Sequence, residues 1–316
     1  MKYAIDPDFH EVLPFLPTTV MEDIGEARAM LAAVVPMLNA DLDESGLVIE
    51  DLEVQGPLGA PAVPVRTYRP VGGGTGGGVL YIHGGGFTAG SIDSEQAVAV
   101  EIAREVDVVV VSVGYRLAPE DPFPAGLDDC YAALTWFHDQ APGLGVDPLR
   151  IGVLGQSAGG GLAAGLALLA RDRGGPALCF QYLGIPELDH RLKTWSMTNF
   201  VDTPLFNLPS AELSWRLYLA DDAIDVSPYA SPSRATDFTG LPPAYIATME
   251  FDPLRDEGIN YATALLRAGV SCELHSFPGT FHGSALVAAA DATRRSNAEM
   301  VAVLSRRLGE PTQPPK

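Results

Sequence analysis

One serine of the chain lies in a sequence pattern that could make it a nucleophile. Ser157 is the centre of Gly155-Gln156-Ser157-Ala158-Gly159, between an apolar segment expected to be a strand and a small-residue segment expected to be a helix. In this context a G-x-S-x-G pattern places the serine on a strained turn at the end of a sheet. The flanking glycines leave room for neighbouring backbones, and the helix directs its free N–H groups toward the serine. The pattern favours attack on a carbonyl carbon over a tight turn that contains serine by chance.

A glycine-rich segment could stabilise the negative charge that such an attack creates. His83-Gly84-Gly85-Gly86-Phe87 follows another apolar segment expected to be a strand. Glycines let the backbone approach a ligand and direct N–H groups at a developing oxyanion. We expect the N–H groups of Gly84, Gly85 and Ala158 to be the donors. We expect His83 to anchor the loop by hydrogen bonds rather than to act as the base.

A serine hydroxyl needs a base, and the base needs a carboxylate that orients it. Of the six histidines, His282 is the predicted base, because it follows the last expected strand in a loop with proline and glycine. His275 lies inside that strand. Asp252 is the predicted acid, because it comes directly after the preceding strand. The alternatives lie at the strand end or in the first helical turn that follows, where acids complement the helix dipole: Glu250, Asp256 and Glu257.

Strand and helix segments alternate along most of the chain and would position these residues. Strands that are apolar on both faces and separated by helices predict a mostly parallel sheet covered by helices, an α/β class. The expected strands are 47–54, 63–68, 78–82, 106–113, 151–154, 178–183, 244–249 and 272–276, of which the first two are expected to pair with each other. The expected helices are 22–38, 97–105, 127–140, 158–171, 211–219 and 258–268.

Two segments lack strand character. Residues 1–47 contain helical spacing and prolines, and residues 184–240 interrupt the alternation with helical pieces. A segment as long as the second is not expected to be plain loop inside a compact domain. We expect one catalytic domain, with a core made of 48–183 and 241–316. The segments 1–47 and 184–240 are expected to form a helical cap over the carboxyl ends of the strands.

Composition excludes several classes of protein. The 316 residues include 20 basic and 40 acidic side chains, for a net charge of −20, and 47% are hydrophobic. That apolar content is sufficient for a large core and excludes general disorder. The negative charge repels phosphate backbones and anionic lipids, so we expect no nucleic-acid partner. Three widely spaced cysteines predict free thiols rather than disulfides or a zinc site: Cys130, Cys179 and Cys272.

Targeting and membrane segments are not expected. The first residues lack the apolar core of a signal peptide, and the longest apolar run, 161–170, is too short to cross a bilayer. We therefore expect a cytoplasmic protein without a membrane partner.

Five motifs in this order resemble one branch of a known family. HGGGF, YRLAPE with PFPA, GQSAGG, DPLRDEG and FHG are similar to the hormone-sensitive-lipase branch of the α/β-hydrolases, over about residues 79–282. The resemblance implies the α/β-hydrolase fold with a helical cap, and a serine carboxylesterase that needs no metal or organic cofactor. It carries the catalytic triad onto Ser157, Asp252 and His282, with small-molecule esters of short acyl chains as substrates. A homodimer is common in this family and is expected here.

Further stretches, IPELD, MTNFVDTPL, PSRATD and ELHSFPGTFHGSALV, resemble bacterial carboxylesterases that act on acetylated alkaloids such as heroin. One departure from the wider family is Gln156, which stands where an aspartate is usual and leaves the contacts that brace the loop open. Specificity is expected to come from the cap, where aromatic residues are candidates for the pocket walls, with burial in the core as the alternative: Phe87, Trp195, Phe206 and Trp215. A lactonase or amidase with the same triad and a non-catalytic ligand receptor on the same fold remain alternatives.

Overall fold

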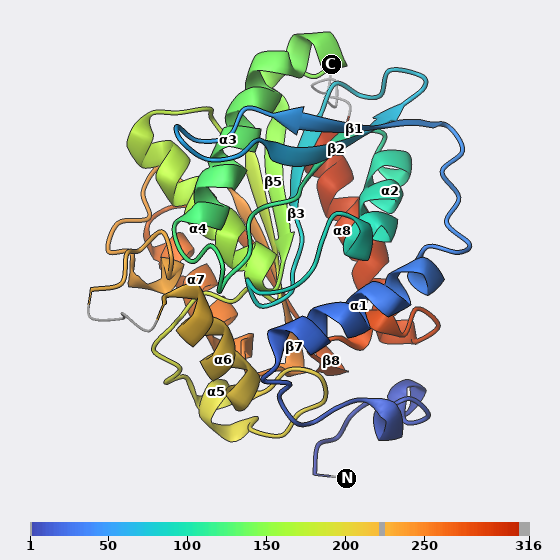
Figure 1. Cartoon of the computed structure of the whole chain (residues 1–316), viewed down its shortest axis with the longest axis vertical. Helices are drawn as coiled ribbons and strands as arrows, with labels where there is room; N and C mark the ends of the chain where they lie inside the picture. Colours follow the sequence, from blue (N-terminus) through green and yellow to red (C-terminus); the bar gives the residue numbers. More distant parts are fainter. Residues whose placement is uncertain (1, 221–224, 310–316) are drawn as a thin grey trace, which may run out of the picture.

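An eight-stranded sheet forms the centre of the molecule (Figure 1). The computed structural model describes residues 2–220 and 225–309. The strand order is β1-β2-β4-β3-β5-β6-β7-β8, and all neighbours from β4 to β8 are parallel, whereas β1–β2 and β2–β4 are antiparallel. The strands are Leu47–Val54 (β1), Val63–Pro70 (β2), Gly78–Ile82 (β3), Val109–Val113 (β4), Ile151–Gln156 (β5), Phe180–Gly184 (β6), Ala244–Phe251 (β7) and Cys272–Phe281 (β8). The predicted mostly parallel sheet is confirmed.

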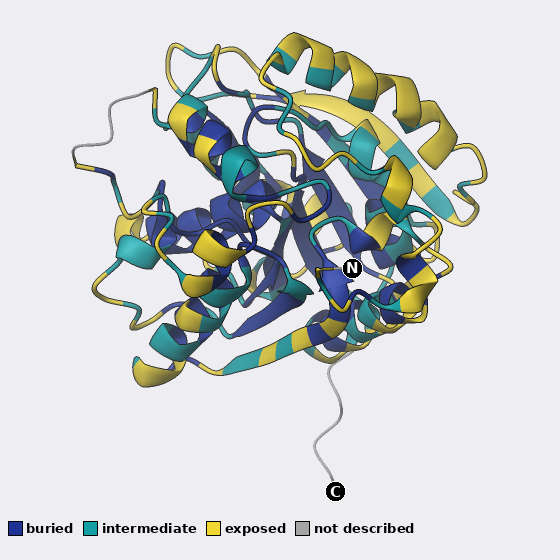
Figure 2. Cartoon of the chain, turned by 90° about the horizontal axis from the view of Figure 1, so that it is seen from below, coloured by how far each residue is buried: buried dark blue, intermediate teal, exposed yellow. Residues whose placement is uncertain are grey.

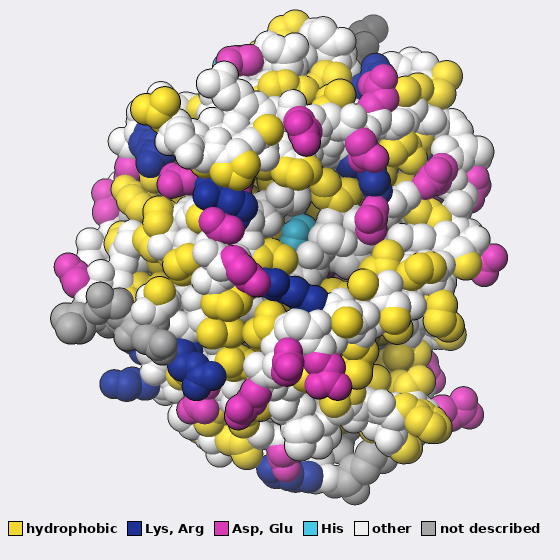
Figure 3. Space-filling model, in the orientation of Figure 1, with side chains coloured by type: hydrophobic (Ala, Val, Ile, Leu, Met, Phe, Trp, Pro, Cys, Tyr) yellow, Lys and Arg dark blue, Asp and Glu magenta, His cyan; other side chains and the backbone are white. Residues whose placement is uncertain are grey.

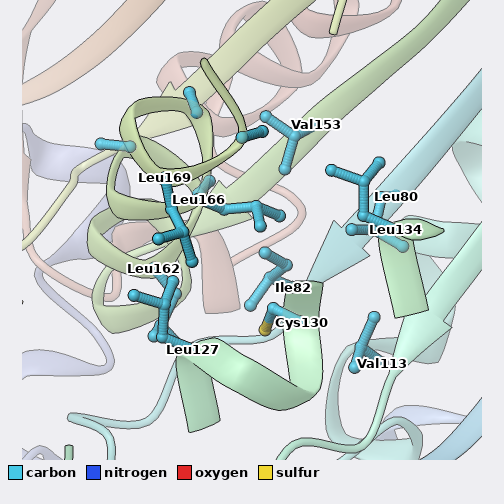
Figure 4. Close-up of a cluster of buried hydrophobic side chains, with 14 of the residues drawn as sticks. Leu80, Ile82, Val113, Leu127, Cys130, Leu134, Val153, Leu162, Leu166 and Leu169 are labelled. Atoms are coloured by element: carbon cyan, nitrogen blue, oxygen red, sulfur yellow. The ribbon is translucent and has the colours of Figure 1, made fainter. Parts of the chain in front are cut away.

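Helices cover both faces of this sheet, because its strands are apolar on both sides. Along β3, Leu80 and Ile82 face one core, whereas Val79 and Tyr81 face the other. The first core contains side chains of α3 (Ala125–Gln140), α4 (Ala158–Arg173) and α7 (Arg255–Arg267), and the second contains side chains of α2 (Gln96–Glu105) and α8 (Asp291–Leu308). Figure 4 shows part of the first core, where side chains of β3, β4 and β5 meet those of α3 and α4. Figure 2 shows the inner strands buried at the centre of the molecule, whereas the edge strands β1 and β8 carry exposed residues.

The N-terminal segment and the segment between β6 and β7 contact each other. The first contains α1 (Ile24–Leu38), and the second contains α5 (Trp195–Asn199) and α6 (Leu208–Tyr218). The backbone N–H of Leu205 donates to the Pro17 carbonyl at 2.7 Å, and Asn207 Nδ2 donates to the Thr18 carbonyl at 2.9 Å. Figure 1 shows α1, α5 and α6 at the same end of the sheet. The predicted division into a core and a cap stays a prediction.

Short 3₁₀ helices occupy several of the connections: Pro7–Phe9, Leu13–Phe15, Asp93–Glu95, Ala141–Leu144, Pro148–Arg150, Pro232–Arg234 and Ser284–Leu286.

A single arginine supplies much of the polar attachment of α1. The helix buries no residue completely, so its position depends on specific contacts. Arg28 donates from Nε to the Thr88 carbonyl at 2.7 Å and from Nη2 to the Ala118 carbonyl at 2.9 Å. The same guanidinium pairs with Glu120 through both carboxylate oxygens, and this pairing lowers the pKa of Glu120 to about 2. The contacts join α1 to the loop that follows the glycine-rich segment and to the loop between β4 and α3.

Two strand boundaries differ from those expected by three residues or more. β4 begins at Val109 rather than at residue 106, because Val106 caps α2 and Asp107 has a positive φ of 58° that turns the chain. β8 continues to Phe281 rather than ending at residue 276. Its pairing with β7 shifts register and resumes with Phe251 opposite Phe281, so the segment expected to be a loop is mostly strand. His282 is therefore held at the end of a strand.

No helix within residues 2–220 and 225–309 combines the length and the hydropathy that a bilayer crossing requires. The three cysteines are free thiols, as predicted, and Cys130 is buried.

The first turn of α4 touches the end of β3, and only glycine permits this contact. A Cβ on Gly159 would lie 2.1 Å from the Ile82 carbonyl oxygen and 2.5 Å from that of His83. Both atoms belong to backbone that the sheet and the following loop hold in place, so neither can withdraw without moving a strand. This contact sets the distance between the Ser157 turn and the glycine-rich loop.

We predict that Gly159→Ala destabilises the protein by about 3 kcal/mol, because the added methyl group overpacks a rigid site. The free energy of unfolding in urea measures the effect. Gly143→Ala is the matched control, since a Cβ there meets nothing within 4 Å. Equal stability of the two variants would contradict the prediction.

Candidate active site

Ser157 lies on a sharp turn between β5 and α4. Its φ of 54° and ψ of −121° are unusual for a residue with a side chain. Three backbone hydrogen bonds hold this conformation: the Ser157 N–H donates to the Gly184 carbonyl at 2.9 Å, and the Ser157 carbonyl accepts from the N–H groups of Gly161 and Glu187 at 3.0 Å each. The turn is thus tied to β6 and to the segment after it. Strain of this kind persists where the surroundings over-determine it, which is typical of functional sites.

Three side chains from three strand ends form one hydrogen-bonded chain. Ser157 Oγ lies 3.0 Å from His282 Nε2, and His282 Nδ1 lies 2.8 Å from Asp252 Oδ2. The Asp252 side chain is 1% exposed, and its Oδ1 accepts from the Leu254 N–H at 2.9 Å. The arrangement allows the imidazole to accept the Ser157 proton while a carboxylate holds its other nitrogen. The structure brings these three predicted residues together.

The alternative acids make other contacts. Glu250 accepts from the Gly279 N–H at 2.7 Å, and Asp256 accepts from the Ser196 N–H at 2.8 Å. Glu257 accepts from the N–H groups of Leu188 and Asp189. Each of these carboxylates therefore stabilises a loop rather than the imidazole of His282.

His83 anchors the glycine-rich loop, as predicted. Its Nδ1 lies 2.8 Å from the Gly84 carbonyl, and its ring stacks on Tyr115 with 4.3 Å between centroids. Tyr115 also donates its hydroxyl to the His83 carbonyl at 3.0 Å. Burial lowers the pKa of His83 to about 4, so the ring is neutral near pH 7. The YRLAPE segment therefore braces the floor beneath the loop.

The expectation that Gly84 donates to an oxyanion is wrong. Its N–H already donates to Glu95 Oε1 at 2.9 Å, and Tyr81 donates its hydroxyl to the other oxygen of Glu95 at 2.6 Å. Among the described residues, none accepts a hydrogen bond from the backbone N–H of Gly85, Gly86 or Ala158. The sequence did not single out the free N–H of Gly86, because three consecutive glycines do not reveal which N–H donates to a distant glutamate.

A cavity of about 710 Å³ opens beside Ser157 and His282. Its walls come from the N-terminal segment, the glycine-rich loop, α2, α6 and α8. Phe206 lines the cavity, as predicted, and its ring stacks on His282 with 4.5 Å between centroids. Further lining residues from the N-terminal segment and from α6 were not predicted: Val20, Met21, Ile24, Leu213 and Ser214.

Three of the four predicted wall aromatics lie elsewhere. Phe87 and Trp215 are 2% and 3% exposed and belong to the core, where Phe87 stacks on Tyr218 at 3.9 Å. Trp195 is 60% exposed, and the Arg255 guanidinium lies 5.4 Å from its ring centroid. These corrections follow the general tendency of aromatic residues to fill cores, and α5 directs Trp195 to the surface.

Gln156 packs on the end of β6. A Cβ on Gly184 would lie 1.9 Å from Gln156 Oε1, so the amide covers this glycine at the cavity wall. The contact that the sequence left open is therefore with backbone of the neighbouring strand.

A buried glutamate lies next to the serine turn and was not predicted. Glu187 is 0% exposed, and within residues 2–220 and 225–309 neither of its carboxyl oxygens has a hydrogen-bond partner. Burial, followed by the nearby charge of Asp252, raises the pKa of Glu187 to about 8. The carboxyl group is therefore neutral at pH 7 and adds no charge beside the Asp252–His282 pair.

Clusters of three or more His, Cys, Asp or Glu side chains that could hold a metal ion do not occur in the part of the chain that the structure describes.

Comparison with known proteins places this arrangement among esterases. Residues 79–286 match the alpha/beta hydrolase fold family. Carboxylesterase NlhH of Mycobacterium tuberculosis is 41% identical over 314 residues, which cover 94% of this chain and 95% of that protein. The solved structure of a bacterial heroin esterase is 52% identical, with a TM-score of 0.94 and coverage of 96% of this chain and 98% of that one. Esterase LipW from Mycobacterium marinum is 38% identical, with a TM-score of 0.87 and 96% of each chain covered.

Glu187 gives stability a specific pH dependence. Its pKa is about 8 in the folded protein, against an ordinary value of 4.5, so between these pH values the folded state binds one proton more than the unfolded state. This residue therefore lowers stability as pH rises from about 4.5 to about 8. We predict that Glu187→Gln removes that loss and becomes more stable than the wild type at pH 8 by a few kcal/mol, since a tenfold change in acid dissociation is worth about 1.4 kcal/mol.

Urea unfolding at pH 5 and pH 8 measures the difference. Glu212→Gln on the exposed side of α6 is the control and should follow the wild type at both pH values. If Glu187→Gln also follows the wild type, the carboxyl group is not kept neutral by burial.

Proposed function

The chain belongs to the α/β-hydrolase family, in its hormone-sensitive-lipase-like branch, and is a carboxylesterase; from this premise we propose that Ser157, His282 and Asp252 hydrolyse short-chain carboxylic esters, with acetyl esters preferred. One observation carries the proposal. A continuous hydrogen-bonded chain of 3.0 Å and 2.8 Å runs from Ser157 Oγ through His282 to Asp252 and lies in the wall of a cavity.

The first half of the proposed reaction forms an acyl-enzyme. Ser157 Oγ attacks the ester carbonyl carbon, and His282 Nε2 takes the hydroxyl proton. Asp252 accepts the Nδ1–H hydrogen bond, which holds the tautomer in which Nε2 is free and stabilises the imidazolium. As the tetrahedral intermediate collapses, the bond to the alcohol oxygen breaks and His282 gives its proton to the leaving alkoxide.

The second half repeats these steps with water. His282 removes a proton from water, and the hydroxide attacks the carbonyl carbon bound to Ser157. The new intermediate releases Ser157 Oγ, which recovers the proton from His282, and the carboxylic acid leaves.

Gly85, Gly86 and Ala158 are the proposed oxyanion donors. Their N–H groups have no acceptor among the described residues, whereas Glu95 occupies that of Gly84. Ala158 is the first residue of α4, so the positive end of this helix supports the same charge. Preorganised donors of this kind commonly supply the largest single contribution to acyl transfer.

Substrate size is proposed to follow from the cap. The segments 1–47 and 184–240 contribute Ile24, Phe206 and Leu213 to a cavity of about 710 Å³, which suits a small ester rather than a polymer. The similarity to a bacterial heroin esterase supports acetylated alkaloids as substrates. A homodimer, a cytoplasmic location and the lack of a nucleic-acid partner stay predictions from the sequence.

We predict that Ser157→Ala lowers kcat for p-nitrophenyl acetate by about 10⁴-fold or more, because the nucleophile is removed. Initial rates with p-nitrophenyl esters from acetate to decanoate should show a short-chain optimum in the wild type. Near-native turnover by the variant would contradict the assignment of Ser157.

The same wild-type protein tests the alternative functions. Turnover of lactones or amides with none of the esters would favour a lactonase or an amidase. Binding of a small molecule without turnover would favour a non-catalytic receptor.

Replacing each carboxylate in turn distinguishes Asp252 from Asp256 as the acid that orients His282. We predict that Asp252→Asn lowers kcat by about 10⁴-fold, because an amide does not hold the imidazole in the required tautomer. Asp256→Asn retains an acceptor for the Ser196 N–H and should change kcat by less than about tenfold. Similar losses in both variants would argue against Asp252 as the orienting acid.

A further inference from the structure

We propose that the Glu101 carboxylate selects esters that carry a positively charged ammonium group. The inference rests on the proposed ester hydrolysis at Ser157 and names the substrate class of that site.

Glu101 lies on the face of α2 that lines the active-site cavity. Ala97, Val98 and Glu101 are lining residues, and their spacing of one and four positions places them along one side of the helix. The lining also includes Ser296, Asn297 and Met300 of α8. Side chains of α2 and α8 belong to the same core cluster, and Figure 1 shows the two helices side by side. Glu101 therefore lines the same cavity as Ser157.

The charge of Glu101 is not compensated by the protein. Among the described residues, Glu101 forms no ion pair and its carboxylate accepts no hydrogen bond, and the cavity lining contains no lysine or arginine. Glu95, the other carboxylate of the lining, differs because Tyr81 and Gly84 both donate to it. Burial, together with the neighbouring Glu105, raises the pKa of Glu101, so its ionised form lacks favourable surroundings.

A ligand cation would supply the positive charge that Glu101 lacks. A carboxylate removed from water and left unpaired is unfavourable, and an opposite charge at a few ångströms offsets that cost most strongly where solvent is partly excluded. The remaining lining is mainly apolar, which suits the carbon skeleton of an ester. A substrate with an ester group at Ser157 and an ammonium group near α2 satisfies both features, whereas an anionic substrate would meet two glutamates.

The overall charge of the protein acts separately from Glu101. The net charge of −20 attracts every cation at long range, and Figure 3 shows carboxylates distributed over the face drawn. Such attraction is screened by salt, whereas contact with a partly buried carboxylate is screened much less. Measurements at high ionic strength therefore isolate the contribution of Glu101.

The experiment compares acetate esters that differ only in charge. Acetyl esters of trimethylammonium alcohols with linkers of two to six carbons are paired with their neutral tert-butyl isosteres, and kcat/KM is measured for each at high salt. We expect the wild type to prefer the cationic member of at least one pair. Glu101→Gln should lower that preference by about five- to tenfold, mainly through KM. Glu105→Gln removes the same charge one turn along α2 at an exposed position and should leave the preference unchanged within about twofold.

Inhibition provides a second measurement. Butyltrimethylammonium should inhibit hydrolysis of the neutral esters competitively in the wild type, with an inhibition constant that rises about five- to tenfold in Glu101→Gln.

The possible results distinguish a failure of the role of Glu101 from a failure of ester hydrolysis. Equal preferences in the wild type and Glu101→Gln, or equal losses in Glu101→Gln and Glu105→Gln, would overturn the role of Glu101 while leaving ester hydrolysis intact. Failure of the wild type to hydrolyse either member of any pair would instead contradict the proposed function, and this inference with it.

Discussion

The contact between the first turn of α4 and the end of β3 is the constraint on which the site depends. Gly159 allows the backbone of α4 to approach the carbonyl oxygens of Ile82 and His83, where a Cβ would clash at 2.1 Å. The same approach places the N–H of Ala158 beside the glycine-rich loop and leaves Ser157 on a strained turn. Hydrogen bonds with Gly184 and Glu187 then tie this turn to the end of β6 and to the segment after it. A sheet with helices on both faces thus provides a rigid base for one unfavourable backbone conformation.

Buried carboxyl groups around this turn have separate tasks because their partners differ. Asp252 contacts His282 and the Leu254 N–H, whereas Glu95 holds the Gly84 N–H and the Tyr81 hydroxyl. Glu187 has no hydrogen-bond partner among the described residues, and its raised pKa keeps it neutral near pH 7. One carboxylate is therefore left to orient the imidazole, which is the arrangement that acyl transfer requires.

The cavity joins parts of the chain that are far apart in sequence. The N-terminal segment reaches the segment between β6 and β7 through hydrogen bonds from Leu205 and Asn207, and Arg28 fixes α1 to the loop after Phe87. The lining that results is mostly apolar, with Glu101 as its uncompensated charge. In the proposed function, chemistry and selectivity therefore come from different elements, since strand ends position Ser157, Asp252 and His282 whereas helices form much of the cavity wall.

The sequence by itself determined the mostly parallel sheet and singled out Ser157, Asp252 and His282, because each follows an expected strand and the carboxyl ends of parallel strands converge at one edge. Only the tertiary structure decided which glycine N–H groups are free, since Glu95 reaches Gly84 from another element. It also directed Phe87 and Trp215 into the core and Trp195 to the surface, and it buried Glu187 beside the serine turn. The physical reason is that local patterns fix backbone periodicity, whereas side-chain partners and burial arise where distant segments pack together.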